Sequence, residues 1–289
     1  MLAKSSTHKL SQTQSRRIAD FFIYLILIAG GILMIGPLLW MISTSLKDKT
    51  GVFQLPPQWI PNPIHWDAYQ RLFHLSQLQT GFMNTIIVSL TVTVIGSFTS
   101  CMAAFSFAKL RMPHKNAMFL LLLVGLMIPY PAVMIPQFMM FSTIGWVDSL
   151  KPLIIPGLFG NITMIFFLRQ YLQGIPDSVV ESAKIDGASY WTIFTRIIFP
   201  LMRPAVAAQF ILWFMGAWND YLGPLIYLNS PEKQTLQVVI ANLSATYATQ
   251  TDYPLIMGLS FISMLPILII FLIFQRQIIE SVALSGMKN

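Results

Sequence analysis

Apolar residues run along this chain in long stretches without Asp, Glu, Lys or Arg, and the charged residues are confined to the segments between them. Six such stretches occur, at residues 21–46, 72–108, 116–147, 152–168, 204–219 and 253–275. A helix of roughly 17–25 residues crosses about 30 Å of hydrocarbon, which each stretch can supply. The pattern therefore predicts six transmembrane helices.

These stretches lack the short alternation of apolar and polar residues that marks the strands of a membrane barrel. Lipid offers no hydrogen bonds to the backbone, so each span has to satisfy its own, as an α-helix does. We expect an all-α polytopic membrane protein. One membrane domain over residues 18–275 should follow an amino tail at 1–17 and precede a carboxyl tail at 276–289. The first stretch exceeds the 7–15 residues of a signal core, so we expect it to be retained as an anchor.

The third stretch contains the run IPYPAVMIP at residues 128–136. Each proline removes a backbone donor and bends a helix, so this run should break the third span. Broken helices often lie beside transport pathways, although a purely structural kink explains any single proline equally well.

Only 10% of the residues are charged, and the formal net charge is +7. Basic residues flank the apolar stretches and are not gathered on a soluble surface, which argues against nucleic acid as a partner. Of the 18 Lys and Arg, 13 lie in the two tails and in the loops 109–115 and 169–203. The positive-inside rule then places both termini and these two loops in the cytoplasm.

The loop between the fourth and fifth stretches has the pattern of two short helices and a turn. Pro176 suits the first turn of a helix that runs to about Lys184, and Gly187 can adopt a positive φ that ends it. Ser189 can cap a second helix that ends at Phe199, ahead of Pro200. Small and aromatic side chains would make this element a knob for a soluble partner, or the helices could simply rest on lipid headgroups.

The same loop contains the run Glu181-Ser182-Ala183, then Asp186-Gly187-Ala188, and then Phe194, Ile197 and Pro200. This run closely resembles the EAA loop of the bacterial ABC importer permeases, with serine at position 182 where alanine is usual. The resemblance implies that this loop, residues 171–200, forms coupling helices that fit a cleft on an ATPase subunit. The positions that carry this implied role are Glu181, Ser182, Ala183, Asp186, Gly187, Ala188, Tyr190, Phe194, Ile197 and Pro200.

Further stretches are similar to the carbohydrate branch of that family, which includes the maltose permeases: TSLK at 44–47, LPPQWIPNP at 55–63, AFSFAKLRMP at 104–113 and WNDYLGPL at 218–225. The resemblance implies import of an oligosaccharide or a related polyol or sugar derivative across the bacterial cytoplasmic membrane. It also implies four kinds of protein partner or ligand: a second permease, two ATPase subunits, an extracellular or periplasmic solute-binding protein, and the sugar. The carboxyl tail departs from the branch at Ser281, where glycine is usual, so its role stays open.

The chain lacks the chemistry of an enzyme. No G-x-x-x-x-G-K-[ST] run is present, so ATP and Mg²⁺ should be bound by the partner subunits, and we expect no cofactor in this chain. The four histidines have no H-x-x-x-H spacing, and Cys101 is the only cysteine and lies within an apolar stretch. We therefore expect neither a metal site nor a catalytic residue.

The fifth stretch concentrates side chains that suit a sugar, because aromatic rings stack on C–H faces and polar groups bond hydroxyls. Asp220 ends this stretch, where it could mark a cavity or simply lie wet at the membrane surface. The candidate substrate pathway comprises Gln209, Trp213, Trp218, Asn219, Asp220 and Tyr221, with Tyr130 as a weaker addition. Interfacial anchoring explains the Trp and Tyr residues equally well.

Two other functions stay open at this point. A secondary transporter would need coupling carboxylates deep in the spans and usually an internal repeat, and neither is evident. A membrane scaffold or sensor would use the 171–200 loop to dock a signalling protein. Co-purification of an ATPase subunit would distinguish the importer from both.

Overall fold

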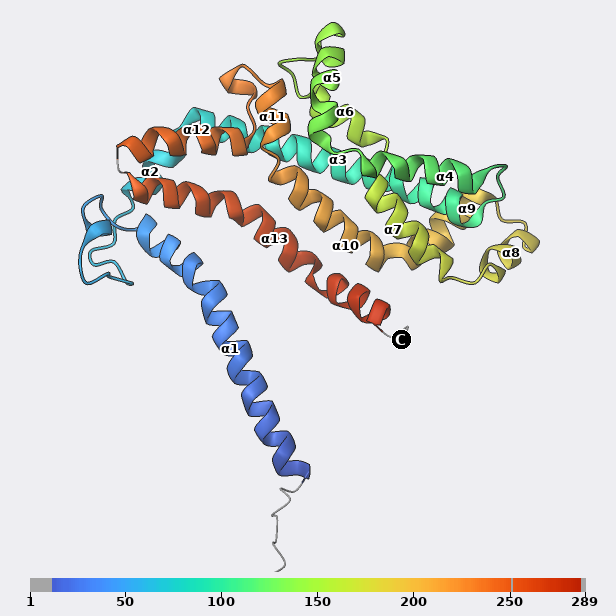
Figure 1. Ribbon diagram of the computed structural model, residues 1–289, viewed down its shortest axis with the longest axis horizontal. Coiled ribbons are helices and arrows are strands. Elements are labelled where there is room, and N and C mark those ends of the chain that lie inside the picture. Colours follow the sequence, from blue (N-terminus) through green and yellow to red (C-terminus); the bar gives the residue numbers. More distant parts are fainter. Residues whose placement is uncertain (1–11, 251, 287–289) are drawn as a thin grey trace, which may run out of the picture. The chain divides into compact units, whose positions relative to one another are not determined.

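The computed structural model describes residues 12–250 and 252–286, and within them the chain forms helices and no strand (Figure 1). The α-helices are α1 (Gln12–Ser45), α2 (Asp67–Phe73), α3 (Ser76–Lys109), α4 (Lys115–Val124), α5 (Tyr130–Thr143), α6 (Lys151–Leu158), α7 (Ile162–Gln173), α8 (Ser178–Ile185), α9 (Tyr190–Ile193), α10 (Phe199–Trp218), α11 (Leu222–Tyr227), α12 (Leu236–Thr249) and α13 (Tyr253–Gly286). A π-helix, Phe194–Ile198, joins α9 to α10, and three 3₁₀ turns lie at Gly51–Phe53, Gly125–Met127 and Pro231–Lys233.

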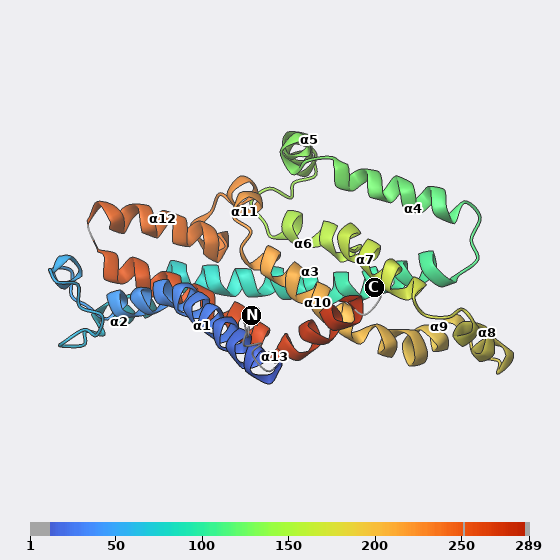
Figure 2. The same ribbon diagram turned by 60° about the horizontal axis from the view of Figure 1, so that its bottom comes forward.

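The predicted spans are present as helices of sufficient length. Five are long and apolar enough to cross a membrane: Ala19–Ser45, Ser76–Lys109, Lys151–Gln173, Tyr190–Trp218 and Tyr253–Arg276. The pair Lys115–Met127 and Tyr130–Thr143 is bent by 96° at the proline run and makes a sixth span if the two helices are taken together (Figure 2). The predicted break of the third span is thus confirmed, and the all-α membrane fold with it.

The described residues fall into two compact units. One comprises the residues up to Arg71 together with Tyr247–Phe261, and the other comprises Leu72–Thr246 with the residues from Ile262 onward. The sequence predicts one membrane domain over 18–275 and shows no boundary near residue 71. Residues 1–11 and 287–289, in the two predicted tails, lie outside the described part of the chain.

In the first unit, a buried carboxylate joins two segments that are distant in sequence. The Asp252 side chain is fully buried and pairs with Arg71 at 2.6 Å and with Lys49 at 3.1 Å. Burial opposes ionisation, but these two cations hold the pKa of Asp252 below its usual value. In contrast, α1 exposes large apolar side chains from Phe21 to Leu39, as expected of a helix that faces lipid or another membrane helix.

In the second unit, α3 is the central helix and packs against α6, α7 and α10. Its buried face is built largely from small residues, and the hydroxyls of Thr85, Ser89, Thr93 and Ser100 bond the carbonyl four residues earlier. A small face that satisfies its own polar groups lets neighbouring helices approach closely. This close packing brings the residues of both candidate sites into place.

The apolar core of this unit lies toward the carboxyl end of α3. It joins side chains of α3 and α7 to Val180 and Ala183 of α8, to Ile193 of α9, and to Phe194 and Ile198 of the π-helix. The loop between α7 and α10 is therefore packed on the bundle as part of its core.

Candidate functional sites

The 171–200 loop folds as two helices joined by a tight turn, as its sequence predicts. At the end of α8, the Ala188 N–H donates to the Ala183 carbonyl and the Gly187 N–H donates to the Lys184 carbonyl, which is a Schellman motif. Gly187 has φ +81°, and the Ser189 hydroxyl accepts a bond from the Thr192 N–H at 3.2 Å. Local side chains thus define the turn, and an L-residue other than glycine would be strained there.

The second helix differs from the prediction that it ends at Phe199. The chain continues through Pro200 into α10, so one helical path runs from Tyr190 to Trp218. Proline cannot donate to the carbonyl four residues earlier. The π-helix at 194–198, where the Phe199 N–H donates to the Phe194 carbonyl, widens the helix at this point. The second helix of the loop therefore continues without a break into a membrane span.

The predicted coupling residues divide into an exposed set and a buried set. The exposed residues are Glu181, Ser182, Asp186, Gly187 and Tyr190. Ala183 and Phe194 are buried, and Ala188, Ile197 and Pro200 are partly buried. The buried members hold the two helices on the bundle, so a partner would contact only the exposed ones. The coupling role of the whole set stays a prediction.

Two exposed apolar side chains enlarge this surface beyond the predicted set. Ile185 is 86% exposed and Trp191 is 58% exposed, although both belong to short amphipathic helices with a buried face. The sequence signal for Ile185 was its position beside the turn, on the face opposite Val180 and Ala183. Large apolar groups on the exposed face of a loop that is otherwise polar typically mark contact with another protein or with lipid.

A lysine at the end of α3 anchors the start of this loop. The Lys109 ammonium donates to the Ile175 carbonyl at 2.6 Å and to the Asp177 carboxylate at 2.5 Å. The Lys109 side chain is buried, and its charge holds the pKa of Asp177 below the usual value. The loop is therefore tied to the carboxyl end of α3 by charge as well as by apolar packing.

The second candidate site is a cavity of about 400 Å³ in the same unit. Residues from α3, α6, α10 and α11 and from the segments after α6, α10 and α11 line it. The polar and aromatic lining residues are Thr85, Asn161, Trp213, Asp220 and Thr235. A volume of this size falls within the roughly 300–1,000 Å³ of small-molecule sites.

Two of the seven predicted pathway residues line this cavity, Trp213 and Asp220. Trp218 is buried instead, with its ring stacked on Phe214 and its indole N–H donated to the Ser263 carbonyl at 3.0 Å. The other four, Gln209, Asn219, Tyr221 and Tyr130, do not line it. The sequence analysis missed Thr85, Asn161 and Thr235, because they come from other segments of the chain.

The base of the cavity is a close contact among three helices. A Cβ atom at Gly96 of α3 would lie 2.3 Å from the Trp213 ring and 2.4 Å from the Gly157 carbonyl oxygen of α6. Only glycine permits this approach. The Trp213 ring is thereby held against α3 and α6, with part of it facing the cavity.

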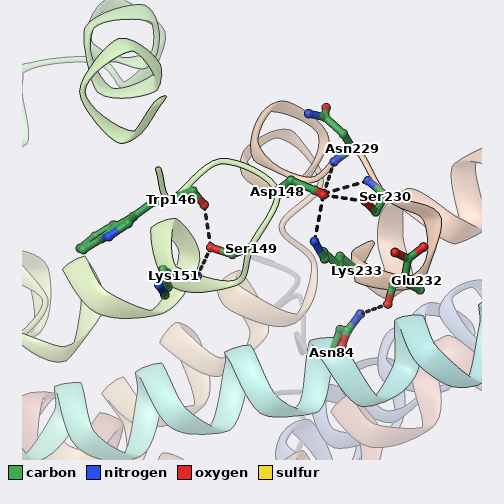
Figure 3. Close-up of polar contacts among 9 residues, drawn as sticks. All are labelled: Asn84, Trp146, Asp148, Ser149, Lys151, Asn229, Ser230, Glu232 and Lys233. Carbon is green, nitrogen blue, oxygen red and sulfur yellow. Dashed lines mark hydrogen bonds and ion pairs between the residues drawn. The ribbon is translucent and has the colours of Figure 1, made fainter. Parts of the chain in front are cut away.

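Asp148 joins the segment before α6 to the segment after α11 (Figure 3). It has φ +60°, and its carboxylate accepts bonds from the backbone N–H groups of Asn229 and Ser230, from the Ser230 hydroxyl and from the Lys233 ammonium. The Ser230 and Lys233 bonds hold the pKa of Asp148 far below its usual value. Nearby, the Asn84 amide donates to the Glu232 and Gln234 carbonyls at 3.0 Å each.

The cavity extends along α3 from Thr85 past Val92, and the loop is anchored at the last residue of the same helix. Asn84 and Thr85 belong to its first third, and Lys109 is its last residue. At 1.5 Å per residue, about 35–40 Å separates these positions along the helix. That distance exceeds the roughly 30 Å of a bilayer core, so the end of the cavity beside Thr85, here called its mouth, and the loop can face opposite sides of a membrane. Among the described residues, no group of His, Cys, Asp and Glu could hold a metal ion.

Comparison with known proteins identifies the class. Residues 96–282 match the family of binding-protein-dependent transport system inner membrane components, and the chain belongs to this family. The match contains the 171–200 loop and most of the cavity lining. This protein is therefore a permease component of an ABC importer, as the resemblance of the loop implied.

Individual relatives extend the similarity over most of the chain. It is 31% identical over 261 residues to the arabinooligosaccharides transport system permease protein of Bacillus subtilis (strain 168), covering 89% of this chain and 92% of the relative. It is 28% identical to the lactose transport system permease protein of Rhizobium radiobacter, over 93% and 96% of the two chains. It is also 28% identical to the sn-glycerol-3-phosphate transport system permease protein of Yersinia pestis, over 91% and 95%.

Solved structures share the fold. A bacterial ABC transporter involved in the import of the acidic polysaccharide alginate contains a chain with TM-score 0.80 and 24% identity, covering 93% of this chain and 99% of that one. A bacterial alginate ABC transporter in complex with an alginate pentasaccharide-bound periplasmic protein contains one with TM-score 0.63 and 17% identity, over 91% and 96%.

Proposed function

We propose that this chain passes a sugar across the bacterial cytoplasmic membrane, from an external binding protein to the cytoplasm, using ATP hydrolysed by separate subunits. The observation that carries this proposal is the 171–200 loop. It presents the exposed part of the family motif on a rigid turn, and its second helix continues into the span that supplies Trp213 to the cavity. Movement of a docked partner can therefore reach the cavity through one helix.

The proposed orientation has both termini and the 171–200 loop in the cytoplasm and the cavity mouth outside. The excess of Lys and Arg in the tails and in the loops 109–115 and 169–203 supports it. Lys109, the buried cation that anchors the loop, belongs to this basic group.

The proposed complex contains a second permease, two ATPase subunits that bind ATP and Mg²⁺, and a solute-binding protein. The sequence has no phosphate-binding loop, so the chain needs a partner to use ATP. One structural neighbour forms a complex with a pentasaccharide-bound periplasmic protein. The exposed apolar side chains along α1 offer a surface for lipid or for the second permease.

A sugar substrate is supported from two directions. The relatives in Bacillus subtilis and Rhizobium radiobacter are named for arabinooligosaccharides and lactose. The cavity combines an aromatic ring with polar groups, which suits a molecule with both C–H faces and hydroxyls.

Purification of the complex from its native membrane tests the proposal. An ATPase subunit with a phosphate-binding loop should co-purify, and reconstituted vesicles should take up sugar only with ATP and the binding protein. Uptake driven by an ion gradient without ATP would favour a secondary transporter. Recovery of a signalling protein without any ATPase would favour a scaffold.

Single cysteines test the orientation in a Cys101→Ala background. We expect an impermeant thiol reagent added outside intact cells, after permeabilisation of any outer membrane, to label Thr249→Cys and to spare Ser189→Cys. Both variants should react after the cytoplasmic membrane is opened. The reverse pattern of labelling would contradict the orientation.

A further inference from the structure

The electrostatic character of the cavity distinguishes among the substrates for which the relatives are named. Those names include neutral sugars, but also sn-glycerol 3-phosphate, which is an anion. A site for an anion normally supplies Arg, Lys or several backbone N–H groups to compensate its charge. The charges of the residues that line this cavity therefore indicate whether it suits a neutral or an anionic solute.

Asp220 is the only charged residue that lines the cavity within the described part of the chain, and no Lys, Arg or His lines it. One Asp220 oxygen accepts a bond from the Gly223 N–H at 3.2 Å. None of the ion pairs formed by the described residues includes Asp220. Its negative charge is thus uncompensated by any cationic side chain and available to a ligand.

Two lysines lie two residues from a lining residue along the chain, and neither lines the cavity: Lys151, which is exposed, and Lys233. Lys233 lies two residues before the lining residue Thr235, but its ammonium is 2.9 Å from the Asp148 carboxylate (Figure 3). Asp148 thereby holds Lys233 in a defined pairing outside the cavity lining. The charge that lines the cavity is therefore that of Asp220.

Thr235 provides an independent indication of a ligand. Thr235 lines the cavity, and its side-chain oxygen is buried and has no hydrogen-bond partner within the described part of the chain. The residue as a whole is only 3% exposed. A buried hydroxyl without a partner costs free energy, and a ligand hydroxyl in the cavity would remove that cost.

Trp213 adds an aromatic surface to the carboxylate of Asp220 and the hydroxyl of Thr235. Its ring is held against Gly96 and Gly157 and also lines the cavity, so an apolar face is available at a defined orientation. Aromatic faces stack on the C–H faces of sugar rings, and carboxylates accept bonds from vicinal hydroxyls. Each of the three side chains thus matches a feature that a neutral saccharide carries.

We propose that this chain itself binds a neutral saccharide in the cavity, through Trp213, Asp220 and Thr235, and that Asp220 excludes anionic sugars and sugar phosphates. The inference rests on the proposed function, since it names the substrate class of the same pathway. It assigns selectivity to the permease in addition to the binding protein. A phosphate or uronate next to Asp220 would meet like charge in a partly desolvated site.

The experiment uses the complete transporter in proteoliposomes with its binding protein. ATP-dependent uptake is measured with four labelled probes: lactose and arabinotriose as neutral saccharides, and sn-glycerol 3-phosphate and an alginate trisaccharide as anions. We expect uptake of at least one neutral probe at a rate at least ten-fold above that of either anion.

Variants then test the named side chains. Asp220→Asn and Thr235→Val should each lower uptake of the neutral probe about ten-fold. The first variant loses a charge-assisted hydrogen bond to the ligand, and the second loses a hydrogen bond between the Thr235 hydroxyl and the ligand. Asp220→Asn should also narrow the ratio between neutral and anionic probes. Asp67→Asn and Thr93→Val are matched controls, because Asp67 lies outside the cavity and the Thr93 hydroxyl bonds its own helix. Both controls should transport at the wild-type rate.

Retention of the ATPase subunits distinguishes failure of this inference from failure of the proposed function. If every variant retains the ATPase subunits and the expected selectivity is found, the inference stands. Equal or faster uptake of an anion, no uptake of any probe by a complex that contains the ATPase, or unchanged uptake by both cavity variants would overturn it while leaving the importer intact. Absence of both ATPase subunits and ATP-dependent uptake would instead overturn the proposed function.

Discussion

The two candidate sites are held together over very different distances in the sequence. In the 171–200 loop, the Schellman motif and the Ser189 cap join residues within five positions of one another. At the cavity, the Asp148 bond to the Ser230 N–H spans 82 residues, and the Thr85 bond to the Leu236 N–H spans 151. The loop is a local structure placed on the bundle, whereas the cavity exists only when distant segments assemble.

This difference suits the proposed roles of the two sites. A docking element has to keep its shape while forces act on it, and short-range bonds provide that rigidity. A transport cavity has to change its shape, and contacts between separate helices can rearrange while each helix stays intact. Substitutions in the two regions should therefore have distinct signatures.

The largest expected effect comes from Gly96→Val at the base of the cavity. The new side chain would overlap the Trp213 ring and the Gly157 carbonyl, so α3, α6 and α10 would have to separate. We expect the free energy of unfolding to fall by about 3 kcal/mol or more, the upper end of the cost of overpacking a core, as measured by thermal melting of the purified complex. Gly216→Ala is the control, because its Cβ would meet nothing within 4 Å. Equal melting of Gly96→Val and wild type would contradict the close packing.

The next effect is confined to the loop. Gly187→Val forces a β-branched residue into a positive φ, a strain of about 1–2 kcal/mol, and should lower substrate-stimulated ATP hydrolysis several-fold. Melting of the rest of the chain should barely change. Gly187→Asn should restore activity, because asparagine tolerates this conformation. If Gly187→Val kept full ATPase binding and full stimulation, the loop would not be the coupling element.

A smaller, local effect is expected from Asp148→Ala. The substitution removes the acceptor shared by two backbone N–H groups, a hydroxyl and an ammonium. Amide hydrogen exchange over residues 227–235 should accelerate by about three- to ten-fold. Exchange in the 171–200 loop should stay at the wild-type rate. Acceleration in both regions would show that the two sites are coupled in the resting state.

The smallest effect concerns pH at the loop. Lys109 lowers the pKa of Asp177, so this pair stabilises the folded loop at pH values above the unfolded pKa of about 3.9 and loses that contribution as the pH falls through the folded value. Asp177 is exposed, so we expect a change below about 1 kcal/mol. Loop protection, measured by limited proteolysis, should be constant from pH 8 to pH 5 and fall below about pH 4. Asp177→Asn should remove this dependence, and a fall already at pH 6 would point to another group.

The sequence by itself determined the features that depend on residue type and short spacing. Long apolar stretches can only be helices in lipid, so the spans followed from composition. Proline broke the third span, and Gly187 and Ser189 defined the turn and the cap, because each acts on its own backbone neighbourhood. The family motif of the loop was recognisable for the same reason.

Tertiary structure alone decided which side chains meet. Nothing local distinguishes Trp213, which lines the cavity, from Trp218, which is buried five residues later in the same helix. Thr85, Asn161 and Thr235 reach the cavity only because the small face of α3 lets three other segments approach it. The continuation of the second loop helix through Pro200 likewise depends on a π-helix packed into the core. Contacts between distant segments form only in the folded chain, so they cannot be predicted from the spacing of residues in the sequence.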